Sequence, residues 1–133
     1  MSETEKIEHI NGPAQSTRAR ESHCHKCPKA ESEKTLESRL RKEVEKRGGM
    51  AIKLLSQLHR GLPDRMVLLP RGAQYFVELK STGEKPTLLQ EHCHKQLRSL
   101  GFQVYIIGSS QALADFLFIA DCEQLERANS HQR

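Results

Sequence analysis

Hydrophobic residues recur at regular spacings in the middle of the chain, and these spacings predict its helices. Apolar residues at every fourth position, followed by a pair of glycines, predict a helix over about 33–47. A threonine that can cap a first turn and a glycine that can end the last one bracket a second helix over 87–100. A short final helix is expected over 111–120. One face of the second helix should carry Leu89, Cys93, Gln96, Leu97 and Leu100.

Short runs rich in β-branched, aromatic and other apolar residues predict the strands. These runs span residues 50–55, 65–69, 74–80 and 102–107. A Pro-Arg-Gly turn joins the second run to the third, so we expect these strands to form a hairpin. The order helix, three strands, helix, strand, helix indicates an α/β fold with a mixed sheet flanked by helices.

The two ends of the chain differ from this middle part. Residues 1–33 are rich in Glu, Ser, Lys and His without a sustained apolar period, which predicts a flexible polar N-terminal arm. Residues 121–133 are also polar and are expected to form a loose C-terminal tail. The folded domain is therefore predicted to span residues 34–120.

Composition and charge indicate the size of the folded domain and the kind of partner that it binds. Of 133 residues, 36% are hydrophobic and 29% are charged, so we expect one small domain with unpacked ends. The net charge of +4 is concentrated in residues 34–120, which carry 14 basic and 8 acidic residues. A basic folded segment suits a polyanion such as nucleic acid, and an aromatic content of 5% argues against a base-stacking platform for single strands. Candidates for contacts with DNA phosphates are Lys53, Arg60, Arg65, Arg71, Lys85, Lys95 and Arg98.

The sequence predicts no association with a membrane. No apolar run approaches the roughly 20 residues that cross a bilayer. The first residues lack the apolar core of a secretory signal. We therefore expect a soluble cytoplasmic protein.

The cysteines leave two interpretations open. Cys24 and Cys27 form a C-x-x-C pair, and His92-Cys93-His94 forms a second cluster far downstream, whereas Cys122 is isolated. Two such half-sites can hold a structural zinc ion. In a helix, however, residues two apart point to different faces, so incidental cysteines and histidines are the favoured interpretation.

Acidic and basic residues gather around the predicted hairpin. Side chains alternate along a strand, so Glu78 and Lys80 share one face, and the hairpin can bring Asp64 close to them. Carboxylates are the ligands that Mg²⁺ prefers, and a nearby lysine can stabilise developing charge. Glu37, at the border of the apolar stripe of the first helix, can join them. This combination favours metal-assisted phosphodiester hydrolysis.

Each of these features also has an ordinary structural explanation. A Glu-x-Lys pair on a strand is commonly an exposed ion pair, and Pro-Asp is commonly a turn. Here the two motifs occur together, each next to an otherwise apolar strand. This combination favours a catalytic site over an ion pair and a turn.

The ordered motifs resemble the VRR-NUC domain of the PD-(D/E)xK nuclease superfamily. They are Gly-Leu-Pro-Asp-Arg-Met-Val-Leu-Leu over 61–69, Tyr-Phe-Val-Glu-Leu-Lys over 75–80, Gln90, and the segment 97–101. The resemblance covers about residues 35–110 and implies a restriction-endonuclease-like core. Because the chain is little more than this domain, it is most similar to the stand-alone phage and bacterial members. This similarity implies the cytoplasm of a bacterial or phage-infected host cell as its location.

The resemblance implies a metal site and its chemistry. Asp64 and Glu78 match the central metal ligands, Glu37 matches a helix glutamate that helps to bind the metal, and the carbonyl of Leu79 commonly completes the shell. Mg²⁺ or Mn²⁺ is the implied cofactor. The expected products carry a 5′-phosphate and a 3′-hydroxyl.

The resemblance also implies the remaining roles. Lys80 matches the catalytic lysine, and Gln90 matches a glutamine that supports the lysine or the phosphate. We expect a DNA endonuclease that acts as a homodimer. Its substrate is either branched DNA, such as a four-way junction or a flap, or plain duplex DNA. The apolar segment 116–119 either forms the dimer surface or covers the sheet. The alternatives are a non-catalytic, zinc-stabilised DNA-binding module and a nuclease that needs a partner protein for targeting.

Overall fold

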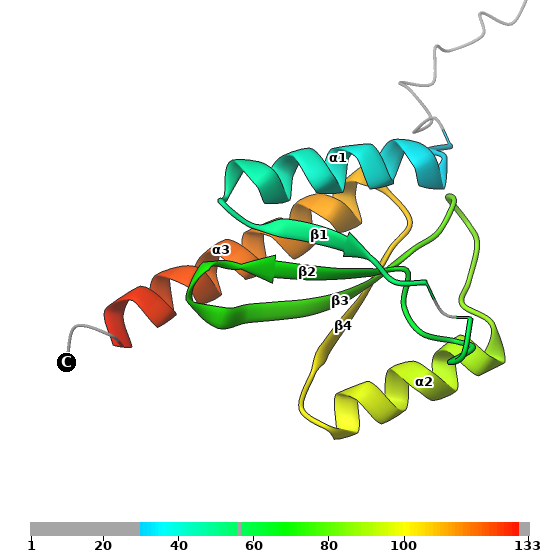
Figure 1. Cartoon of the computed structure of the whole chain (residues 1–133). Helices are drawn as coiled ribbons and strands as arrows, with labels where there is room; N and C mark the ends of the chain where they lie inside the picture. Colours follow the sequence, from blue (N-terminus) through cyan, green and yellow to red (C-terminus); the bar gives the residue numbers. More distant parts are fainter. Residues whose placement is uncertain (1–29, 56, 131–133) are drawn as a thin grey trace, which may run out of the picture.

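A four-stranded sheet with helices on both faces organises the protein (Figure 1). The structure is a computed structural model and describes residues 30–55 and 57–130. The α/β class expected from the sequence is confirmed. In chain order the elements are α1 (Glu33–Lys46), β1 (Met50–Lys53), β2 (Arg65–Leu69), the 3-10 turn η1 (Pro70–Gly72), β3 (Ala73–Leu79), α2 (Leu88–Ser99), β4 (Gln103–Ile107) and α3 (Ser110–Ser130).

The strand register determines which chain segments meet at each edge. The spatial order is β1-β2-β3-β4, in which β1, β2 and β3 are antiparallel and β3 and β4 are parallel. Arg65, the first residue of β2, pairs with Val77, close to the end of β3. Asp64 precedes β2, so the register places it beside the last residues of β3. The predicted hairpin therefore brings the expected acidic residues to one edge.

Helix α1 forms where the spacing of apolar residues predicts it. The Ser32 side chain accepts a hydrogen bond from the backbone of Thr35 and caps the first turn. Leu36, Leu40 and Val44 are buried along one face of the helix. They pack on the sheet together with residues of α3, so both helices cover the same face.

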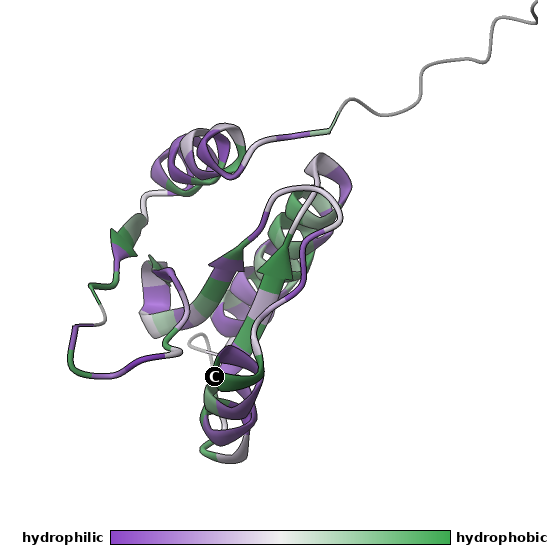
Figure 2. Ribbon diagram, turned by 90° about the vertical axis from the view of Figure 1, so that its right-hand side faces the viewer, coloured by the Kyte–Doolittle hydropathy of each residue, from purple (hydrophilic) through white to green (hydrophobic). Residues whose placement is uncertain are grey.

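The main core lies between this helix pair and the sheet. Tyr75, Val77 and Leu79 of β3 point into it, as their alternation along the strand predicts. The ring of Tyr75 packs edge-on against Phe116 of α3, with centroids 5.5 Å apart. Figure 2 shows hydrophobic residues along the strands and in the middle of α3, whereas α1 is largely hydrophilic.

Helix α2 covers the opposite face of the sheet. The five residues expected on one face of this helix line a common surface hollow beside Leu62 instead of joining the main core. Within α2 only His94 is buried, whereas Leu89 and Leu100 are 49% and 72% exposed. The side of α2 that meets the sheet lies against Glu78, so its contact with the sheet is polar. Apolar contacts on this face include the ring of Phe102, which packs edge-on against Phe76.

Helix α3 continues through Ser130, so the predictions of a helix ending at residue 120 and a loose tail after it are wrong. The polar residues beyond position 120 have partners on the folded core. Asp121 binds Arg47 through two hydrogen bonds of 2.7 and 2.9 Å, and Glu123 accepts a hydrogen bond of 2.6 Å from the hydroxyl of Tyr75. These contacts stabilise the helix where the hydrophobic pattern ends.

The apolar segment 116–119 divides between two environments. Phe116 and Leu117 are buried in the core, whereas Phe118 is 70% exposed and Ile119 is 39% exposed. The segment therefore covers the sheet with one half and meets solvent with the other. Among the helices of residues 30–55 and 57–130, none combines the length and apolar character needed to cross a bilayer.

Replacing Tyr75 with phenylalanine tests the docking of α3. The change removes the hydroxyl that donates to Glu123 and keeps the buried ring. We expect the free energy of unfolding, measured by urea denaturation, to fall by about 1–2 kcal/mol because a hydrogen bond to a carboxylate is lost. Ser130→Ala, an exposed change in the last turn, should alter it by less than about 0.5 kcal/mol. An unchanged stability in Tyr75→Phe would show that this bond does not hold α3.

Candidate active site

Asp64 is held at the edge of the sheet where β2 begins and β3 ends. Its Oδ2 atom accepts a hydrogen bond of 3.0 Å from the backbone N–H of Leu79, the last residue of β3. Its backbone carbonyl accepts a second bond, of 2.8 Å, from the N–H of Leu54. The carboxylate of Asp64 is therefore tied to the strand that carries Glu78.

Glu78 is the central group of the site and has no exposed surface. Its Oε1 atom accepts hydrogen bonds from the Lys80 ammonium at 2.8 Å and from Nε2 of Gln90 at 2.5 Å. Burial raises the pKa of Glu78, the Lys80 ammonium opposes this effect, and the nearby charge of Asp64 raises the pKa further. Two carboxylates and one ammonium thus share a partly dehydrated edge of the sheet.

Lys80 stays a cation in this setting. Its side chain is 15% exposed, and burial alone would lower its pKa. The hydrogen bond to Glu78 and the charges of Glu78 and Asp64 outweigh burial and raise the pKa of Lys80. The ammonium is therefore available as a fixed positive charge beside the carboxylates.

Gln90 links the site to the beginning of α2. The side-chain Oε1 atom of Gln90 accepts a hydrogen bond of 2.9 Å from the backbone N–H of Thr87, and the backbone N–H of Gln90 donates to the Thr87 hydroxyl at 3.3 Å. This reciprocal pair is a capping box, which stabilises the first turn of the helix. The side-chain Nε2 atom of Gln90 donates to Glu78, so one side chain both caps α2 and supports the buried carboxylate.

Glu37 lies apart from the other expected metal ligands. Its carboxylate forms an ion pair with the guanidinium of Arg65, which is only 7% exposed beneath α1. Residues 30–55 and 57–130 contain no group of three or more His, Cys, Asp or Glu side chains arranged to hold a metal ion. The structure therefore joins Asp64 with Glu78 and places Glu37 with Arg65.

The residues expected to contact phosphates differ in their exposure to solvent. Arg65 was expected to reach DNA, but it is buried against Glu37, so this expectation is wrong. Arg98 donates a hydrogen bond of 2.9 Å to the backbone carbonyl of Val104. The other expected contacts lie on the surface, and they are Lys53, Arg60, Arg71, Lys85 and Lys95.

His94 is a site residue that the hydrophobic pattern did not reveal. It lies one helical turn after Gln90, is 1% exposed, and its Nε2 atom is 3.7 Å from Oε2 of Glu78. Burial, with the charges of Arg98 and Lys80, lowers the pKa of His94. The four-residue spacing from Gln90 is the signal that places both side chains on one helix face.

The described residues do not include both halves of the zinc site that the sequence left open. Cys24 and Cys27 lie outside the described residues. Cys93 is partly buried on α2, and Cys122 is exposed on α3. His92 is exposed, whereas His94 faces Glu78, so the His92-Cys93-His94 cluster points in different directions.

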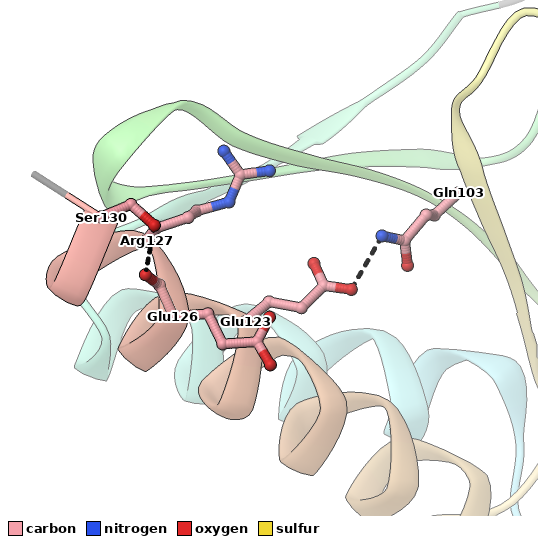
Figure 3. Close-up of a pocket in the computed structure, with 5 residues that line it drawn as sticks. All are labelled: Gln103, Glu123, Glu126, Arg127 and Ser130. Atoms are coloured by element: carbon pink, nitrogen blue, oxygen red, sulfur yellow. Dashed lines mark hydrogen bonds between the residues drawn. The ribbon is translucent and has the colours of Figure 1, made fainter.

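A polar hollow lies away from this site, at the beginning of β4 (Figure 3). Gln103 pairs with Tyr75 in the sheet register, at the opposite end of β3 from Leu79. The amide of Gln103 donates to Glu123 at 2.8 Å, and Ser130 donates to the backbone of Glu126. The bond between Gln103 and Glu123 joins β4 to α3 and supports the docking of this helix, whereas the bond of Ser130 lies within α3.

The chemistry of the edge site suits a divalent cation. Asp64 and Glu78 provide neighbouring carboxylates, and Mg²⁺ is bound in proteins through one or two carboxylates together with water and phosphate oxygens. Oε2 of Glu78 is buried without a hydrogen-bond partner among the described residues. A cation would compensate for this buried charge, so the residues present fit the metal that the resemblance implies.

Comparisons with known proteins identify relatives of this chain. "Putative nuclease p44" from Acyrthosiphon pisum secondary endosymbiont phage 1 is 48% identical over 77 residues, which are 58% of this chain and 83% of that protein. A solved structure described as "VRR_NUC domain" matches with a TM-score of 0.62 and 29% sequence identity. This match covers 65% of the present chain and 96% of the other. No family model matches the sequence.

Replacing Glu37 with alanine tests whether this residue stabilises the metal-free protein through Arg65. The change leaves a buried guanidinium without its carboxylate. We expect the free energy of unfolding, measured in EDTA, to fall by about 2 kcal/mol, less than for a fully buried pair because Glu37 is partly exposed. Glu45→Ala removes an exposed glutamate of the same helix and should cost less than about 0.5 kcal/mol. Equal effects of the two changes would contradict a stabilising pair.

Proposed function

Since this chain belongs to the VRR-NUC family of nucleases, we propose that it is a divalent-metal-dependent DNA endonuclease whose active site contains Asp64, Glu78 and Lys80. The observation that carries the proposal is the buried Glu78, which lies beside Asp64 and binds the ammonium of Lys80. A buried carboxylate beside a second carboxylate and a lysine is costly for stability alone and is typical of a functional site.

Asp64 and Glu78 would hold Mg²⁺ or Mn²⁺, together with the backbone carbonyl of Leu79, the residue that follows Glu78. When bound, such a cation lowers the pKa of a coordinated water and offsets negative charge on the phosphate. Asp64 is oriented by the N–H of Leu79, and Glu78 by Gln90 and Lys80. These hydrogen bonds anchor one oxygen of each carboxylate before a substrate arrives.

Lys80 would stabilise the transition state of phosphodiester hydrolysis. Its ammonium is held at the carboxylates and retains its proton, so it offers a positive charge to a phosphate oxygen as negative charge develops there. Water attacks phosphorus and gives up a proton, and the bond from phosphorus to the 3′ oxygen breaks. The leaving 3′ oxygen takes up a proton to form the 3′-hydroxyl, and the other strand end keeps the 5′-phosphate. Glu37 can join this site only by leaving Arg65, so its proposed part in metal binding is secondary.

DNA would be bound mainly through its backbone. The surface cations Lys53, Arg60, Arg71, Lys85 and Lys95 can contact phosphates without reading base sequence. We further propose that the protein acts as a homodimer on branched DNA such as four-way junctions. The exposed side chain of Phe118 is available for contacts between protomers.

Cleavage of labelled duplex DNA with Mg²⁺, Mn²⁺ or EDTA tests the catalytic proposal. Asp64→Asn and Lys80→Met should lower the cleavage rate by on the order of 100-fold or more, because each removes a charge from the reacting centre. Asp115→Asn and Lys42→Met make the same chemical changes on exposed helix surfaces and should leave the rate unchanged. Cleavage in EDTA, or full activity in the first two variants, would contradict the proposed site.

The substrate preference and the dimer are tested together. A four-way junction should be cut faster than a linear duplex of the same arm sequence, and sedimentation velocity should give twice the mass of one chain. Phe118→Asp should shift the protein toward the monomer, because a charge would be buried at the contact. Equal rates on the two substrates would reject branch selectivity. A monomer at all concentrations would reject the dimer.

A further inference from the structure

Helix α2 directs two side chains, one turn apart, at the two oxygens of a single carboxylate. Nε2 of Gln90 donates to Oε1 of Glu78 at 2.5 Å. Nε2 of His94 lies 3.7 Å from Oε2 of the same carboxylate. Residues at positions i and i+4 are neighbours on a helix surface, so this arrangement follows directly from the sequence spacing.

The second of these contacts is incomplete. His94 and Glu78 are 1% and 0% exposed, and their facing atoms have no hydrogen-bond partner in the part of the chain that the structure describes. A separation of 3.7 Å is too long for a hydrogen bond. Buried polar atoms without partners are unfavourable, so a small shift that closes this gap lowers the free energy.

We propose that His94 is a positioning residue of the nuclease site, donating from Nε2 to Oε2 of Glu78 and fixing the rotation of that carboxylate. The inference rests on the function proposed above, because it concerns the acid that would bind the cation. His94 touches neither the substrate nor the cation in this role.

The need for a second donor follows from the crowding on the first oxygen. Lys80 and Gln90 both bind Oε1 of Glu78, so without His94 the carboxylate can turn about this anchored atom. The orientation of Oε2 relative to Asp64 then varies. Residues that hold a metal ligand in place contribute about 10-fold to 100-fold to metal affinity.

Variants of His94 in the full chain test the proposal, with the affinity for Mn²⁺ measured by calorimetry. His94→Leu should weaken binding at least about 10-fold. His94→Gln carries an amide N–H at a similar distance from the backbone. Its affinity for Mn²⁺ should be within about 3-fold of that of the original protein. The amide of His94→Asn is too short to reach Glu78 and should behave as the leucine variant does. His92→Leu, an exposed change on the same helix, should have no effect.

Activity provides a second measurement. The leucine and asparagine variants should lower kcat for duplex cleavage while KM for DNA stays constant, because the DNA-binding surface is unchanged. Circular dichroism verifies folding. If the leucine variant does not fold, the comparison of glutamine with asparagine decides the question.

The outcomes separate this inference from the function on which it rests. Equal Mn²⁺ affinity in the glutamine, asparagine and original proteins would overturn the role of His94 and leave the nuclease proposal intact. Absence of both Mn²⁺ binding and cleavage in the original protein would overturn the nuclease proposal and the positioning role together.

Discussion

A carboxylate removed from water needs donors around it, and Glu78 obtains them from two parts of the chain. Lys80 follows the same strand and Gln90 arrives from the first turn of α2, and both donate to Glu78. The pairing of β2 with β3 brings Asp64 alongside, and its like charge increases the need for these donors. The sheet register, the position of α2 and the charge of the lysine therefore all bear on one buried group. Its stabilisation is a shared property of these elements rather than of any single contact.

Much of the fold follows from local patterns. The four-residue apolar spacing of α1 and the runs that form the strands are visible in the sequence because each element buries one continuous face. The proximity of Asp64 to Glu78 was also predictable, since alternation along β3 and a hairpin with β2 leave little choice of geometry. In these cases short-range constraints are sufficient to place a side chain.

Contacts between distant polar residues could not be predicted in this way. Arg65 looks like any surface arginine in the sequence, yet it is buried because Glu37 lies above it on α1. The end of α3 is polar enough to suggest a loose tail, but Asp121 and Glu123 bind Arg47 and Tyr75. Charged residues have the same hydropathy whether they meet water or a partner, so the distinction depends on tertiary structure.

The double use of Gln90 restricts which amino acids that position can accept. A capping box is satisfied equally well by glutamate or glutamine, so helix stability alone would permit either. A glutamate here would place a third negative charge against Glu78 and could not donate to it, whereas the amide donates to Glu78 and accepts from Thr87 at the same time. The electrostatics of the site therefore restrict the amino acids that this position can accept, although a substitution would change the structure most visibly at the first turn of the helix.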